Sequence, residues 1–215
     1  MPSKNALKIY KEDSYYHIYN RGVAKANIFK DKKDYKVFLD YLKIYLSPVD
    51  LQGESLKVSP SRELKNYSDE IILVAYCLMP NHFHLLIHQK NKDSINYFMR
   101  SLATKYSRYF NTRYDRVGPL FQGVYKAVKV DNEDQLVYLT KYIHRNPINI
   151  LPTRRVLVGY KYSSYGNYLG LFKQVWVKPN MILGLFSASN KLFSYKSFVE
   201  ELEEDYSSIN KIVLD

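Results

Sequence analysis

The sequence predicts an α+β fold in which helices pack on an antiparallel sheet, and three observations carry this prediction. Strand-like and helix-like hydrophobic periodicities alternate in the order β-α-β-β-α-β-α. Two apolar segments, 71–79 and 82–89, are separated only by Pro80 and Asn81, which predicts a buried hairpin. The order strand, helix, hairpin, helix, strand is typical of the split βαβ, ferredoxin-like arrangement, and we expect the helices on one face of the sheet.

The first predicted strand covers residues 15–20 and ends at an Arg-Gly pair. Asp31 is a residue type that caps helices, and the apolar residues after it recur at spacings of three and four as far as Leu46. An amphipathic helix is therefore predicted here. Residues 47–68 contain Pro, Gly and several Ser, which predicts a surface insertion rather than a domain boundary.

The second half of the pattern contains two more helices and one more strand. Ser94 is the predicted cap of a helix that runs to about Arg113 and has one apolar side and one basic side. Residues 122–130 predict the next strand. Asn132 is the predicted cap of a third helix, which runs toward Pro147.

A length of 215 residues predicts one main domain with additions at its ends. We expect an N-terminal extension at 1–14, the main domain at 15–150, and a C-terminal appendage at 151–215. The appendage begins with a Tyr- and Ser-rich segment and ends with an acidic helix, predicted over about 194–206.

Composition narrows the class of protein. Cys77 is the single cysteine, which excludes an internal disulfide and a thiolate zinc cluster and favours a reducing cytoplasm. The first residues contain no apolar run that resembles a signal peptide, and no stretch of 18 apolar residues occurs. We therefore expect a cytoplasmic protein with no membrane partner.

The net charge of +11 is unevenly distributed. Residues 200–215 hold six acidic side chains and one lysine, so the first 199 residues carry +16. Such a basic body favours a polyanionic partner, with nucleic acid ahead of an anionic membrane surface. A lysine-rich solvated surface is the alternative.

The segment after the hairpin turn presents two histidines on one side. Side chains alternate along a strand, so His82 and His84 share a face, as a metal ion or a phosphate would require. His88 has the same parity but lies near the end of the strand and is the weaker candidate. Two exposed strand histidines without function are the alternative for this pattern.

Catalytic metal centres usually take a third protein ligand. On the third helix Tyr138, Tyr142 and Asn146 recur at i, i+4 and i+8, which places a phenol beside a carboxamide oxygen on one face. The alternative is that both tyrosines belong to the core and that Asn146 only ends the helix before Pro147.

Five motifs together resemble the single-tyrosine HUH transposases, and in particular the REP-associated tyrosine transposases. The resemblance spans about residues 15–170. In order, the motifs are YHIYNRG at 16–22, LMPNHFHLLI at 78–87, FQGVYKA at 121–127, YIHRNP at 142–147 and YKYSSYGNYLG at 160–170.

This resemblance implies an HUH catalytic domain at 15–150, with His82, His84 and Asn146 as ligands of Mg²⁺ or Mn²⁺ and Tyr142 as the nucleophile. Asn at the third ligand position, where the insertion-sequence branch typically has Gln, favours the REP-associated branch. Val124 stands where many relatives have Arg, so one DNA contact of the family is not expected here.

The implied function is cleavage and rejoining of single-stranded DNA beside a hairpin through a 5′-phosphotyrosine, with no nucleotide cofactor, by a monomer or homodimer. A non-catalytic single-stranded nucleic-acid-binding module and a metal-dependent hydrolase that uses water are the alternatives. Basic residues on the predicted second helix and nearby strands are the candidate DNA contacts: Arg21, Arg100, Lys105, Arg108, Arg113, Arg116, Lys126 and Lys129. Tyr109 and Tyr125 are candidate platforms for base stacking.

Overall fold

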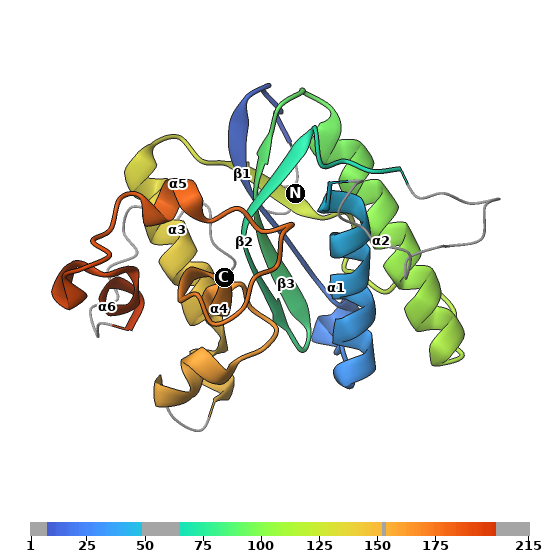
Figure 1. The fold of residues 1–215 in the computed structure, drawn as a ribbon. Coiled ribbons are helices and arrows are strands. Elements are labelled where there is room, and N and C mark those ends of the chain that lie inside the picture. The colour runs from blue at the N-terminus through green and yellow to red at the C-terminus, as the bar shows by residue number, and fades with distance from the viewer. Residues whose placement is uncertain (1–7, 49–64, 152–153, 201–215) are drawn as a thin grey trace.

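A computed structural model describes residues 8–48, 65–151 and 154–200 (Figure 1). Its centre is one antiparallel sheet in the order β2-β3-β1-β4. The strands are β1 (Ser14–Arg21), β2 (Ile71–Met79), β3 (His82–Gln89) and β4 (Lys126–Lys129). Because β3 lies between β1 and β2, the unit that joins β1 to β2 through a helix is a split βαβ. The predicted α+β fold is confirmed.

Helices cover both faces of the sheet (Figure 1). The first face packs on α1 (Lys32–Leu46) and α2 (Ser94–Arg113), and the second packs on α3 (Glu133–Arg145) and the C-terminal segments. The prediction that the helices lie on one face is therefore wrong. The physical reason is visible in β2, which is buried along almost its whole length and needs cover on both sides.

A β-bulge in β2 lets this strand supply both cores. Leu73 pairs with Ile87 and Ala75 pairs with Leu86, so Val74 is the extra residue. As a result Val74 and Ala75 both belong to the core under α3, whereas Leu73 belongs to the core under α1 and α2.

Two of the three predicted helix caps are confirmed. The Asp31 side chain accepts hydrogen bonds at the start of α1, and the Asn132 side chain accepts one at the start of α3. The prediction for Ser94 is wrong by one residue, because Asp93 occupies the cap position. The Ser94 hydroxyl instead donates to Glu70 Oε2 at 2.8 Å.

The last strand is shorter than predicted. Gly123 has a φ of 81°, which turns the chain before β4 begins at Lys126. Upstream of this turn, Phe121 forms only an isolated bridge with Gly22. At the end of α3 the chain tightens into a 3₁₀ helix, η5 (Asn146–Ile150), which accommodates Pro147 in its first turn.

The described part of the C-terminal segment is built into the molecule. Trp176 and Val177 join the core under α1 and α2, and Tyr165 and Tyr195 join the core under α3. Of the predicted acidic helix, only α6 (Tyr195–Glu200) is described. The remaining short helices are η1 (Val23–Lys25), η6 (Arg154–Gly159), α4 (Tyr165–Tyr168), α5 (Asn180–Leu183), η7 (Lys191–Phe193) and α6 (Tyr195–Glu200).

Parts of three predictions lie outside the described residues: the N-terminal extension before residue 8, most of the insertion at 47–68, and the acidic helix beyond residue 200. Among the described helices, none combines the length and the apolar character that a membrane span needs.

Candidate active site

The side chain of His82 meets that of Asn146 between the sheet and the end of α3. His82 Nε2 lies 3.0 Å from Asn146 Oδ1, and His82 Nδ1 lies 2.6 Å from Asn81 Oδ1. Asn81 Nδ2 donates to the Lys25 carbonyl oxygen, which fixes its Oδ1 as an acceptor for His82. A neutral His82 therefore carries its proton on Nδ1 and turns the lone pair of Nε2 toward Asn146.

The loop after β1 holds Asn81 in this position. Gly22 N donates to the Asn81 carbonyl oxygen at 2.8 Å. A Cβ at Gly22 would overlap the carbonyl oxygen of Ala26, so only glycine lets this loop close so tightly. The Arg-Gly pair predicted to end the first strand thus helps to orient His82.

His84 is fully buried, and its two ring nitrogens have different surroundings. Nδ1 lies 2.9 Å from His17 Nε2, whereas Nε2 is buried without a hydrogen-bond partner among the described residues. Burial, followed by the neighbouring imidazoles of His82 and His17, holds the pKa of His84 well below its usual range. A neutral His84 that donates from Nδ1 to His17 leaves the lone pair of Nε2 open.

Tyr142 lies over these histidines. Its ring centroid is 5.4 Å from that of His84 and 6.1 Å from that of His17, both edge to face. Tyr138, one turn earlier on α3, packs against Phe198 of α6 at 5.5 Å. The two tyrosines of the predicted helical face therefore have different neighbours. Tyr142 is the one in contact with the histidine cluster, which consists of His17, His82 and His84.

The donor atoms at this site fit a divalent cation. His82 Nε2 and Asn146 Oδ1 are two acceptors 3.0 Å apart, and His84 Nε2 is an orphaned buried lone pair. Burial, with a contribution from the charge of Arg21, lowers the pKa of His82 and favours its neutral form, although the Asn146 contact opposes this. No group of three His, Cys, Asp or Glu side chains in the described ranges could hold a metal ion, so a three-ligand set at this place would need the amide of Asn146.

Two further histidines lie elsewhere. His88 Nε2 contacts Asp13 Oδ1 at 2.9 Å at the far end of β3. His144 on α3 is fully buried, and its ring nitrogens contact the hydroxyl groups of Tyr195 and Ser164 at 2.7 and 2.8 Å. Burial lowers the pKa of His144 to about 3, so this residue is a neutral link between α3 and the C-terminal segment.

Sequence reasoning missed His17, which orients His84. In the register of the sheet, His17 lies opposite Leu86, and its parity on β1 places it on the face of the two predicted ligands. The sequence signal for a histidine on this face is in the predicted strand 15–20, where His17 alternates with apolar residues.

The candidate DNA contacts are divided between the two faces. Arg21 is paired with His82 in the sheet register, and Lys126 is paired with Tyr19, whose ring lies 6.1 Å from that of His84. Both therefore lie close to the histidine cluster. Arg100, Lys105 and Arg108 are on α2, across the sheet from it, and Arg100 lines a hollow of about 440 Å³ with Tyr125.

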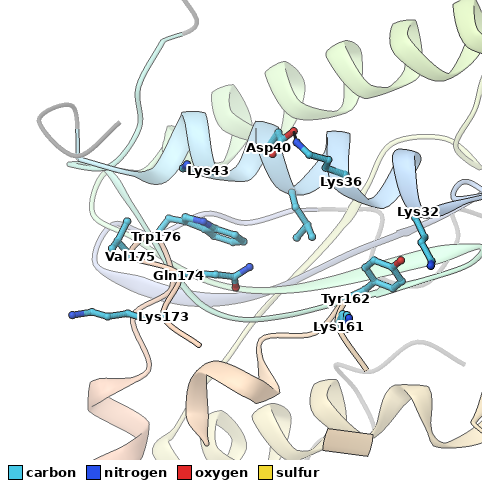
Figure 2. A pocket seen from close by; sticks show the side chains of 11 residues that line it. Lys32, Lys36, Asp40, Lys43, Lys161, Tyr162, Lys173, Gln174, Val175 and Trp176 are labelled. Carbon is cyan, nitrogen blue, oxygen red and sulfur yellow. Dashed lines mark hydrogen bonds and ion pairs between the residues drawn. The ribbon is translucent and has the colours of Figure 1, made fainter. Parts of the chain in front are cut away.

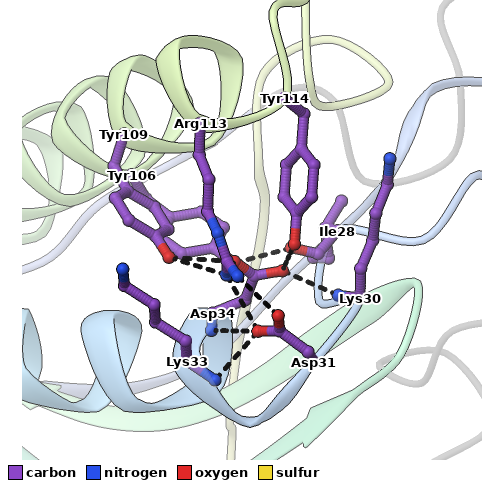
Figure 3. A network of polar contacts seen from close by, with 9 residues as sticks. All are labelled: Ile28, Lys30, Asp31, Lys33, Asp34, Tyr106, Tyr109, Arg113 and Tyr114. Carbon is purple, nitrogen blue, oxygen red and sulfur yellow. Dashed lines mark hydrogen bonds and ion pairs between the residues drawn. The ribbon is translucent and has the colours of Figure 1, made fainter.

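The remaining three candidates have partners within the chain. Arg113 forms ion pairs with Asp31 and Asp34, as Figure 3 shows. Because its guanidinium is held by these two carboxylates, we do not expect it to bind a DNA phosphate. Arg116 Nη1 donates to Asn111 Oδ1 at 2.8 Å, and Lys129 pairs with Asp131 at 2.9 Å. The Tyr109 hydroxyl donates to Asp34, so this candidate stacking ring is part of the same network as Arg113.

The fold and the site together define a sheet that presents a histidine cluster to a tyrosine on a neighbouring helix. Residues 55–146 match the model of a protein family described as IS200-like transposases. The matched range contains both histidines, Tyr142 and Asn146. The resemblance to transposases indicated by the motifs is thereby confirmed.

Two solved structures match this chain. A REP-associated tyrosine transposase bound to a REP hairpin aligns over 87% of this chain and 94% of its own, with a TM-score of 0.54 and 11% identity. A transposase candidate from Deinococcus radiodurans R1 aligns over 67% of this chain and 97% of its own, with a TM-score of 0.38 and 16% identity. Among curated proteins, none matches the sequence.

Proposed function

We propose that this protein is a transposase that cleaves and rejoins single-stranded DNA beside a hairpin, through a covalent bond between Tyr142 and a 5′-phosphate. The observation that carries the proposal is the placement of the Tyr142 ring over His84, beside the pair His82 Nε2 and Asn146 Oδ1. The candidate nucleophile and the three candidate metal-ligand atoms thus lie on one side of the sheet.

In the cleavage step, Tyr142 Oη forms a bond to phosphorus and the bond from phosphorus to the 3′-oxygen breaks. The phenolic proton ends on the departing oxygen, which becomes a free 3′-hydroxyl. Rejoining is the reverse step with the 3′-hydroxyl of another strand. One phosphodiester is exchanged for another, so no ATP is needed.

His82, His84 and Asn146 would hold Mg²⁺ or Mn²⁺, and Mn²⁺ suits the two imidazoles better. When bound, such a cation withdraws charge from the scissile phosphate and neutralises the charge that develops in an in-line displacement. The chain's own task is to keep the ligands neutral and aimed. Burial does the first, and the hydrogen bonds that His82 donates to Asn81 and His84 donates to His17 do the second.

A hairpin ligand is supported by the similar fold of the REP-associated tyrosine transposase, which was solved bound to a REP hairpin. A single-stranded scissile segment is also favoured physically, because a flexible strand reaches a half-buried tyrosine more readily than a duplex does.

The test is incubation of the protein and a divalent cation with an end-labelled hairpin that has single-stranded flanks, followed by a denaturing gel. A covalent protein–DNA adduct supports the proposal. Unaltered DNA would favour a non-catalytic binding module, and free cleaved ends without an adduct would favour a hydrolase that uses water.

Tyr142→Phe and Tyr138→Phe form a matched pair, because both residues are half-buried on α3 and each variant loses only a hydroxyl group. Tyr142→Phe should eliminate the adduct and retain hairpin binding, whereas Tyr138→Phe should keep most of the activity. Peptide mapping of the adduct decides the assignment directly, since a nucleotide on a peptide with Tyr138 would overturn it.

A further inference from the structure

A second hollow, of about 610 Å³, lies between α1 and the segment along the β2 edge of the sheet (Figure 2), and none of the histidines lines it. One wall is α1. The other is the segment that follows the free edge of β2, where Leu78 N donates to the Tyr162 carbonyl oxygen and Lys178 N donates to that of Leu73. We call this hollow the lysine groove, after the five lysines that line it: Lys32, Lys36, Lys43, Lys161 and Lys173.

The lysine groove has a strong excess of positive charge. Asp40 is the one acidic residue among the described residues that line it, and it pairs with Lys36 at 2.6 Å. Lys32, Lys161 and Lys173 are exposed. Lys32 belongs to the α1 wall, and the other two belong to the opposite wall. A negatively charged ligand that lies in the groove would thus be contacted from two sides.

The spacing along α1 suits a chain of phosphates rather than a single anion. Lys32, Lys36 and Lys43 lie on one side of the helix, at i, i+4 and i+11. Eleven residues of helix span about 16 Å. A stacked nucleic-acid strand carries one phosphate per about 3.4 Å of its axis, so this length faces about five phosphates.

The aromatic rings at the groove already have partners. Trp176 is almost fully buried and stacks on Tyr76 at 5.4 Å, and Tyr162 stacks on Tyr35 at 3.7 Å. These rings are therefore not platforms for bases. Contacts in the groove would be electrostatic and independent of sequence.

We propose that the lysine groove binds the phosphodiester backbone of the DNA substrate and guides it to the end of the sheet where His82 lies. One end of the groove is at Tyr162, whose carbonyl oxygen accepts a hydrogen bond from Leu78 N of β2. The next residue of β2, Met79, lies opposite His82 in the sheet register. The identity of the ligand as DNA rests on the proposed function, whereas the binding of a linear polyanion rests on the groove itself.

The test compares two triple variants that remove the same charge. The groove variant is Lys32→Gln/Lys161→Gln/Lys173→Gln, and the control variant is Lys90→Gln/Lys92→Gln/Lys196→Gln, whose lysines are also exposed but lie outside the groove. Binding of a fluorescent hairpin with single-stranded flanks is measured by anisotropy at several salt concentrations, after circular dichroism has shown equal melting temperatures.

Each lost phosphate contact should lower the log–log salt slope by about 0.7, so the groove variant should lose about 2 and bind roughly 100-fold more weakly at 0.1 M salt. The control variant should change affinity less than about threefold. Shuffling the flank sequence should leave the loss in the groove variant unchanged.

Adduct formation by the wild type, measured in parallel, separates the two proposals. An adduct together with equal affinities of the groove and control variants would overturn the groove and leave the function standing. No adduct, with a selective loss in the groove variant, would support the groove and overturn the function. Loss of binding to anionic vesicles with unchanged DNA affinity would assign the groove to a membrane surface and overturn the proposal.

Discussion

Replacement of Arg113 by methionine should destabilise the protein by about 2–3 kcal/mol. Arg113 Nη1 donates to Asp34 Oδ1 at 2.5 Å, and Asp34 is fully buried (Figure 3). Removal of one partner of a buried ion pair costs about 3–5 kcal/mol. Asp34 keeps donors from Lys30 N, Tyr109 Oη and Tyr114 Oη, which reduces this cost. The half-exposed pair with Asp31 adds little to this cost, because water screens it.

For a chain of this length, such a loss lowers the melting temperature by about 5–10 °C. Urea unfolding followed by far-UV circular dichroism measures the free energy directly. Arg108→Met, which removes an exposed arginine from the same helix, is the control and should change stability by less than about 0.5 kcal/mol. The double variant Arg113→Met/Asp34→Asn should recover part of the loss, because no buried charge is left without its partner.

The reasoning would be refuted if Arg113→Met were as stable as Arg108→Met and bound hairpin DNA more weakly. That result would restore Arg113 to the set of DNA contacts from which its ion pairs remove it.

Three more outcomes are expected. His84→Ala should abolish the adduct and change hairpin affinity less than about threefold, whereas His88→Ala should keep most of the activity; equal loss in both would show that the ligands are wrongly chosen. Excess EDTA should stop adduct formation without releasing the hairpin, and added Mn²⁺ should restore it; an adduct that persists in EDTA would contradict the metal site. The Arg113 guanidinium lowers the pKa of Asp31 to about 2. The stability that ionised Asp31 contributes to the fold is therefore present above pH 3.8 and is lost as the pH falls toward 2. NMR titration of Arg113→Met should find the pKa of Asp31 raised toward 3.8, while the cap hydrogen bonds from Lys33 N and Asp34 N still lower it. An unchanged pKa would contradict the pairing.

The elements of the main domain could be predicted because their signals are local. A hairpin follows from two apolar runs around a Pro-Asn turn, and a cap follows from one side chain that accepts from the next turn. The shared face of His82 and His84 follows from alternation alone. Recognition of the motifs added Tyr142 and Asn146 as partners, which periodicity had left open.

What could not be predicted depends on contacts between distant segments. The role of His17 requires the knowledge that β1 is the neighbour of β3. The ion pairs of Arg113 require α1 and α2 to pack side by side, and basic residues on a helix look alike in sequence whether they face solvent or a buried carboxylate. The cover on the second face depends on a C-terminal segment that has weak periodicity of its own.

That second face has a consequence for the order in which the protein is made. The core under α1 and α2 is composed mainly of residues that precede β4, whereas the core around Tyr142 also needs Tyr165, Tyr195 and Val199. Because a chain emerges from the ribosome from its N-terminus, His82 and His84 are synthesised about 80 to 120 residues before the residues that complete the core under α3. A nascent chain can therefore fold its first layer early, yet the face that carries Tyr142 is completed only after the segment through Val199 has been made.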